Sequence, residues 1–80
     1  MGKQRVKFSF PEDMVKEPVI HKLGHDYKIV TSIRRADVRE DTGWVILELV
    51  GEDAEIERGL AWVGTTGVRV DLVSGDIVDG

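Results

Sequence analysis

The chain has 80 residues, with eleven basic against fifteen acidic side chains, a formal net charge of −4 and no cysteine. This length predicts a single small domain over residues 1–80. The missing cysteines exclude disulfides, thiolate metal sites and cysteine-ligated clusters within the chain. The acidic balance argues against general nucleic-acid binding, which needs a basic surface. No apolar run approaches the roughly 20 residues of a membrane span and no signal-peptide core follows the polar start, so we expect a cytoplasmic protein.

The first part of the chain predicts a strand followed by a short helix. Three apolar side chains alternate with polar ones over residues 5–10, which is typical of a strand with one buried face. A helix is expected over residues 17–23, with Pro18 in its first turn, where a missing N–H costs nothing. Gly24 is expected to end this helix in a left-handed conformation.

The middle of the chain predicts a β-hairpin. Residues 27–38 and 44–50 are rich in β-branched and apolar side chains, and a polar turn that ends at Gly43 joins them. In the first of these strands, strict alternation puts two sets of side chains on opposite faces, the first being Tyr27, Ile29, Thr31 and Ile33 and the second Val30, Ser32, Arg34 and Ala36.

The last part of the chain predicts a second helix and a fourth strand. Acidic residues favour a helix start at residue 52, and apolar spacing continues to residue 63. We expect the helix to fray before Gly64, because glycine weakens a helix interior. Residues 68–72 alternate as a strand. The domain core therefore spans about residues 5–73, and residues 74–80 form a polar tail.

This order of elements predicts an α+β fold of the ferredoxin-like type, βαββαβ. Two right-handed crossovers give a four-stranded antiparallel sheet in the order 4-1-3-2, with both helices on one face. The expected sheet core consists of the strand residues that face the helices, which are Val6, Phe8, Phe10, Val45, Leu47, Leu49, Val68, Val70 and Leu72.

The other face of this sheet has no helix to cover it. An exposed apolar patch that contains tryptophan is typical of an interface, so we expect dimerisation through this face or through a sheet edge. In the alternative, the tail folds back over part of the face through Ile77 and Val78. The expected interface residues are Trp44, Ile46, Val50 and Ala36, with Val30 beside them.

Several short motifs follow one another between Val6 and Leu72 in a characteristic order. They are the opening strand at residues 6–10, the helix start Pro18-Val19-Ile20, the strand at residues 27–34, the turn Thr42-Gly43-Trp44, the stretch at residues 47–51, and Leu60-Ala61-Trp62 followed by Gly67-Val68-Arg69-Val70. With these motifs the chain resembles the NIL domain, a ferredoxin-like relative of the ACT domains. NIL domains occur at the C-terminus of methionine ABC importer ATPases and in ferredoxin-associated proteins.

The resemblance implies a regulatory module that binds methionine or a similar amino acid as a homodimer. In importer members the asparagine of the Asn-Ile-Leu tripeptide belongs to a methionine site near the dimer interface. This tripeptide falls on Ser32-Ile33-Arg34, where Ile33 alone matches. The Ser32 hydroxyl can hydrogen-bond a ligand, and the Arg34 guanidinium can bind a carboxylate, as can free N–H groups at the helix start. The expected ligand-binding residues are Val30, Ser32, Ile33, Arg34, Pro18, Val19 and Ile20.

A second function stays open beside the first. In it, the chain is a ligand-free interaction or dimerisation module that accompanies an iron–sulfur or sulfur-metabolism protein. The partner under either hypothesis is a transporter ATPase or an iron–sulfur protein, and no cofactor is expected in this chain.

Catalytic patterns are weak, and we expect no enzyme activity. His21 and His25 have the spacing of helical metal ligands, with Asp26 beside them. Gly24 is expected to interrupt the helix between them and no third ligand has a defined spacing, so we interpret both as solvent-facing side chains and expect no metal. The chain has no glycine-rich phosphate loop after a strand and no serine with a base at recognisable spacing.

Overall fold

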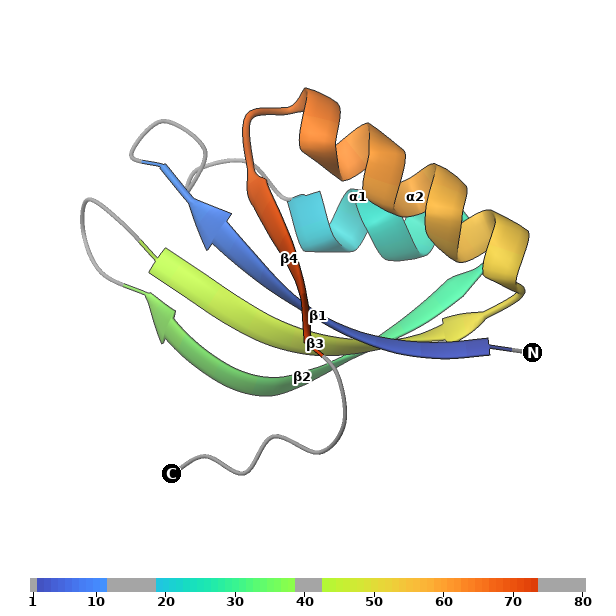
Figure 1. The fold of residues 1–80 in the computed structure, drawn as a ribbon, viewed down its shortest axis with the longest axis horizontal. Coiled ribbons are helices and arrows are strands. Elements are labelled where there is room, and N and C mark those ends of the chain that lie inside the picture. The colour runs from blue at the N-terminus through green and yellow to red at the C-terminus, as the bar shows by residue number, and fades with distance from the viewer. Residues whose placement is uncertain (1, 12–18, 39–42, 74–80) are drawn as a thin grey trace.

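A computed structural model describes residues 2–11, 19–38 and 43–73 of the protein. These residues form a four-stranded antiparallel sheet in the order β2-β3-β1-β4, which is the predicted order read from its other edge. Both helices lie on one face of the sheet (Figure 1). The elements are β1 (Gly2–Phe10), α1 (Val19–Asp26), β2 (Ile29–Val38), β3 (Gly43–Gly51), α2 (Asp53–Thr65) and β4 (Arg69–Val73).

The two central strands, β1 and β3, pair along their whole lengths. The register runs from Gly2 opposite Gly51 to Phe10 opposite Gly43. Alternate side chains of β3, beginning with Val45, face the helices and are almost fully buried, as are Val6 and Phe8 of β1. The sequence places the start of β1 at residue 5, whereas the strand begins at Gly2, because the long partner strand continues the hydrogen-bonded ladder beyond the apolar alternation.

Both helices extend past the glycines that were expected to end them. Helix α1 continues through Gly24 to Asp26, and among the described residues a positive φ occurs only at Gly67, at 101°. Helix α2 continues through Gly64 to Thr65. The glycines at 24 and 64 therefore adopt ordinary helical geometry, and the left-handed glycine that follows a helix is Gly67.

Threonine side chains complete the end of α2. The hydroxyl of Thr65 donates to the carbonyl of Trp62, and that of Thr66 donates to the carbonyl of Val63, both at 2.6 Å. The backbone N–H of Thr66 donates to the same Val63 carbonyl at 3.0 Å. These bonds satisfy carbonyl groups that lack partners in the last turn, so the helix holds together beyond Gly64.

Fewer strand residues are fully buried in the hydrophobic core than the sequence predicts. Phe10 and Val70 are partly buried and pack against the core, while Leu72 is 67% exposed. Leu72 lies opposite Val6 and therefore on the helix side of the sheet, but neither helix covers it. The prediction that Leu72 is a core residue is wrong because β4 is an edge strand whose end extends past the helices.

Helix α2 packs closely against α1 and β2 at Gly59. A Cβ atom at this position would lie 2.7 Å from Cδ1 of Leu23 and 2.9 Å from Cδ1 of Ile29. Both side chains are buried, at 0% and 5% exposure. Gly59 therefore lets α2 pack directly on the α1 and β2 side chains, whereas a Cβ at Gly64 would meet nothing within 4 Å.

Alanine substitutions at these two glycines should have opposite effects on the free energy of unfolding. Gly64→Ala should stabilise the protein by up to about 1 kcal/mol, because alanine is the better helix former and the site is open. Gly59→Ala should destabilise it by about 1 kcal/mol, since overpacking costs more than the same propensity gain. Urea denaturation of both variants measures the difference, and equal stabilisation by both would contradict the close approach.

Candidate functional site

Strand β2 is the most exposed part of the described chain. It lies at the edge of the sheet, so one side of its backbone has no strand beside it among the described residues. Ile29 at its start is buried beneath the helices, but every residue from Ser32 to Ala36 is exposed. Val30 is 65% and Ile33 60% exposed, and the three predicted ligand residues Ser32, Ile33 and Arg34 are consecutive in this uncovered segment.

A β-bulge at Arg34 divides this segment. Ile33 lies opposite Leu47, but Arg35 lies opposite Ile46, so Arg34 is an extra residue without a register partner in β3. Because paired residues share a face, Ile33 is on the helix side and Ser32, opposite Glu48, is on the open side. Arg34 lies at the bulge itself, between the helix side and the open side of the sheet. Its side chain is long enough to reach either face.

The bulge also corrects one predicted interface residue. Strict alternation puts Ala36 on the open face, whereas its register partner is Val45, which faces the helices. Arg35 takes the open-face position beside Ile46 instead. The placement of Ala36 in an open-face interface is therefore wrong, because one inserted residue reverses the facing of all that follow.

The predicted residues at the start of α1 do not form an exposed ligand surface. Val19 is 3% exposed and belongs to the core, and Ile20 is partly buried against it. Pro18 lies outside the described residues. The side chain of Val19 therefore supports the fold and is closed to a ligand, whereas that of Ile20 keeps some accessible surface.

The open face of the sheet mixes apolar and charged side chains. Trp44, Ile46 and Val50 lie there as predicted, opposite Ser9, Lys7 and Lys3 of β1, and all three are partly buried. The ammonium of Lys7 lies 5.2 Å from the centroid of the Trp44 ring, and Arg5 forms an ion pair with Glu48 at 3.3 Å. The expected continuous apolar patch is therefore interrupted by cations.

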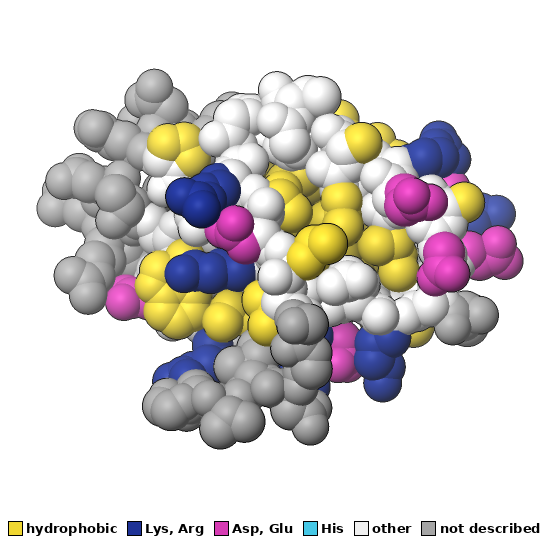
Figure 2. Space-filling model, in the orientation of Figure 1, with side chains coloured by type: hydrophobic (Ala, Val, Ile, Leu, Met, Phe, Trp, Pro, Cys, Tyr) yellow, Lys and Arg dark blue, Asp and Glu magenta, His cyan; other side chains and the backbone are white. Residues whose placement is uncertain are grey.

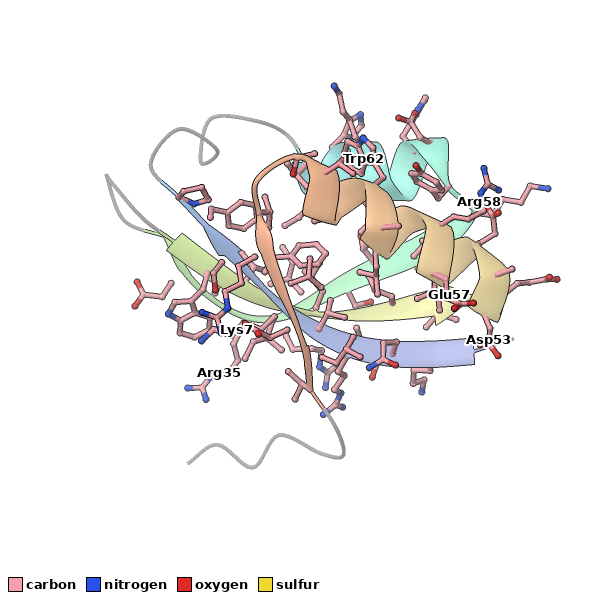
Figure 3. The ribbon with its side chains drawn as sticks, turned by 45° about the horizontal axis from the view of Figure 1, so that its top comes forward. Lys7, Arg35, Asp53, Glu57, Arg58 and Trp62 are labelled. Carbon is pink, nitrogen blue, oxygen red and sulfur yellow. The ribbon has the colours of Figure 1, made fainter. Side chains whose placement is uncertain are left out.

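Two of these cations, Lys7 and Arg35, lie on the side of the sheet away from the helices (Figure 3). Sequence reasoning treated Lys7 only as a solvent-facing residue, although Lys3, Arg5 and Lys7 alternate along one strand and so must share a face. This alternation in the sequence is enough to predict that the three side chains share a face. No such pattern predicts the face on which Arg35 lies, because its position depends on the bulge.

A small hollow of about 400 Å³ opens at one end of the open face. Trp44, Ser9 and Arg69 lie side by side across three strands at this level and line it, together with residues at the strand ends. The hollow combines an aromatic wall, a hydroxyl group and a guanidinium group. It contains none of the predicted ligand residues of β2, so it is a separate place where a small molecule could bind.

The start of β2 is tied to α2 by a carboxylate. Acidic side chains gather near the start of α2 (Figure 2). The first turn of this helix holds Asp53 and Glu55, and Glu55 accepts a hydrogen bond from the backbone N–H of Lys28 at 3.1 Å. Arg58 donates to the other carboxylate oxygen at 2.6 Å. The Lys28 bond first, and then the Arg58 charge, hold the pKa of Glu55 below its ordinary value of 4.5. This link fixes the chain immediately before β2.

Within residues 2–11, 19–38 and 43–73, no three His, Asp or Glu side chains are placed to hold a metal ion together. No helix in this part of the chain has the length and apolar character to cross a bilayer.

The arrangement is that of a small ferredoxin-like α+β domain with an exposed edge strand. The chain belongs to the NIL domain family, which matches residues 4–72. It is 26% identical over 76 residues to methionine import ATP-binding protein MetN 1 of Enterococcus faecalis, covering 90% of this chain and 21% of that protein. The chain thus spans about a fifth of the length of this relative.

Solved structures support the same fold. The C-terminal domain of an ABC transporter ATP-binding protein from Enterococcus faecalis superposes with a TM-score of 0.78 at 18% identity, over 91% of this chain and 86% of that one. The de novo designed protein Ferredog-Diesel superposes with a TM-score of 0.55 at 14% identity, over 91% and 85%. At these identities the likeness concerns the fold alone.

Replacing Glu55 should make stability depend on pH in a defined way. A carboxylate with a lowered pKa in the folded state stabilises fully above the unfolded pKa and loses this effect as pH falls through the folded pKa. Glu55→Gln should therefore lower the unfolding temperature at pH 7 and approach the parent as pH falls below 4.5. Thermal melts across this range measure the difference. Glu57→Gln removes an equal charge from α2, and identical behaviour of the two variants would refute the Lys28 link.

Proposed function

We propose that this protein is a regulatory module that binds a small amino-acid ligand, methionine or a similar compound, and works as a homodimer linked to methionine transport or sulfur-amino-acid metabolism. The family and the methionine-import relative support the link to transport. The observation that carries the binding proposal is the uncovered segment of β2, where Ser32, Ile33 and Arg34 are exposed in a row beside the bulge.

The chemistry of this segment suits an amino acid with an apolar side chain. Val30 and Ser32 lie on the open face of the sheet, where an apolar group and a hydroxyl can contact the same ligand. The guanidinium of Arg34 can form charge-assisted hydrogen bonds with the ligand carboxylate. Ile33 lies on the opposite face, so within one copy it cannot touch a ligand that rests on Ser32.

A second copy would add a second set of these residues beside the first on each face of the sheet, because strand pairing keeps every side chain on its own face. Two β2 strands paired antiparallel through their free edges would bring both exposed segments together and extend the sheet across the dimer. Exposed apolar side chains of the two copies would then lie beside each other on the same face, Val30 on the open face and Ile33 on the helix side. A ligand at this junction contacts residues of both copies, which couples binding to association.

In this proposal the module is an accessory to another protein and catalyses no reaction itself. Its partner is the ATP-binding part of a transporter, and the place of action is the cytoplasm. An NMR titration of the labelled protein with L-methionine tests the ligand directly, with L-leucine and homocysteine as controls. Saturable shifts at Ser32, Ile33 and Arg34 support the site on β2, whereas flat spectra at millimolar ligand would refute methionine binding.

Removing one guanidinium should distinguish the two candidate places for the ligand. Arg34→Gln should weaken methionine binding roughly 10- to 100-fold, because a hydrogen bond to a charged group contributes about 1.5–3 kcal/mol. Arg69→Gln, at the hollow beside Trp44, should leave the affinity unchanged. Isothermal titration calorimetry measures both constants, and the reverse result would move the site to the hollow.

Association through β2 should be sensitive to a charge at the exposed edge. Ile33→Glu should weaken the dimer, since the junction would gain a carboxylate from each copy on the same face of the paired strands in place of an apolar contact. Leu72→Glu is the matched control, because Leu72 is equally exposed and also on the helix side, but at the opposite edge. Sedimentation equilibrium of both variants and the parent measures the mass. An Ile33→Glu variant that dimerises as strongly as the parent would refute pairing through β2.

The second candidate function is a ligand-free interaction module, for which the partly buried side chains of Trp44 and Ile46 on the open face are the specific observation. A ligand at 100 times its dissociation constant should stabilise a binding module by about 2.7 kcal/mol, while an interaction module should not respond. Under this alternative, Trp44→Ala rather than Ile33→Glu should weaken association.

A further inference from the structure

Two histidines lie one turn apart on the exposed side of α1. The continuous helix through Gly24 places His21 and His25 on the same face, where residues four apart are neighbours. Their rings are 5.7 Å apart between centroids and inclined by 26°. The sequence gives two reasons against a metal at this pair, a helix break at Gly24 and the lack of a third ligand, and the structure removes the first because α1 has no such break.

A carboxylate orients one of these rings. Nδ1 of His25 lies 3.0 Å from Oδ1 of Asp26, so the ring can donate its Nδ1–H to the carboxylate and keep the Nε2 lone pair free. A carboxylate hydrogen-bonded to the far nitrogen is the usual support of a metal-binding histidine, because it fixes the tautomer and raises the basicity of the ligating nitrogen. His25 thus already has the carboxylate contact that supports a metal-binding histidine, although the fold itself gives this contact no other role.

We propose that His21 and His25 form a binding site for a borderline divalent transition-metal ion such as Zn²⁺ or Ni²⁺, with Asp26 as the supporting carboxylate. Two imidazoles favour these ions over Mg²⁺ and Ca²⁺, which prefer oxygen ligands. The side chains of His25 and Asp26 are 74% and 55% exposed, so water can reach the remaining coordination positions of the ion. The site is on α1 and does not depend on the proposed function of β2.

Titration of the ¹⁵N-labelled full chain with Zn²⁺, followed by NMR, tests the site. We expect one saturable set of shifts confined to α1 and its ends, a change in the His21 and His25 ring signals, and a higher unfolding temperature, because an ion that binds only the folded helix stabilises it. Mg²⁺ should give no such change. Flat spectra at millimolar Zn²⁺, or shifts centred on other parts of the chain, would overturn the proposal.

Two variants test the geometry and the support separately. The double variant His21→Ala/Asp26→His keeps two histidines but puts them on adjacent positions that point in different directions, so Zn²⁺ binding should be lost. Asp26→Asn should keep the site but weaken it roughly 10- to 100-fold. Both variants change exposed residues, and the NMR spectrum itself reports whether they fold. Unchanged affinity in the double variant would refute the chelate, and unchanged affinity in Asp26→Asn would refute the supporting role.

Discussion

The contact of α2 with α1 and β2 at Gly59 is the constraint on which the rest of the domain depends. Only a residue without a side chain lets the buried ends of Leu23 and Ile29 pack directly against the second helix. This contact draws both helices over the central strands and the first part of β2. The two helices are then too short to cover the remainder of β2, and the exposed segment around Ile33 is the direct result.

The sequence predicts the strand order and the helix-covered face correctly because both follow from chain-wide patterns. The two-residue period of β1 and β3 is regular, and each apolar position that faces the helices between Val45 and Leu49 is buried. The residue at which each helix ends was harder to predict. A glycine such as Gly24 permits a helix to end but does not require it, and the tertiary contacts of α1 decide where the helix stops.

The sequence predicts the strand that carries Ser32, Ile33 and Arg34 but not the orientation of their side chains. The three residues are exposed, and the bulge determines on which face of the sheet each one lies. No pattern in the sequence marks an inserted residue inside a regular strand, so Ala36 was assigned to the wrong face and Arg35 was missed. The open face illustrates a second limit. Its apolar residues were identified, but the cation above Trp44 follows from cross-strand register.

The unequal edges of the sheet also bear on how far self-association can proceed. Strand β2 has ten residues and β4 only five, so a head-to-tail array joined from β2 to β4 would form a short ladder at every junction. Pairing of β2 with β2 uses the long edge twice and leaves only the short edges outward. For copies that associate through their sheet edges, the unequal lengths of β2 and β4 therefore favour a closed pair over an open array.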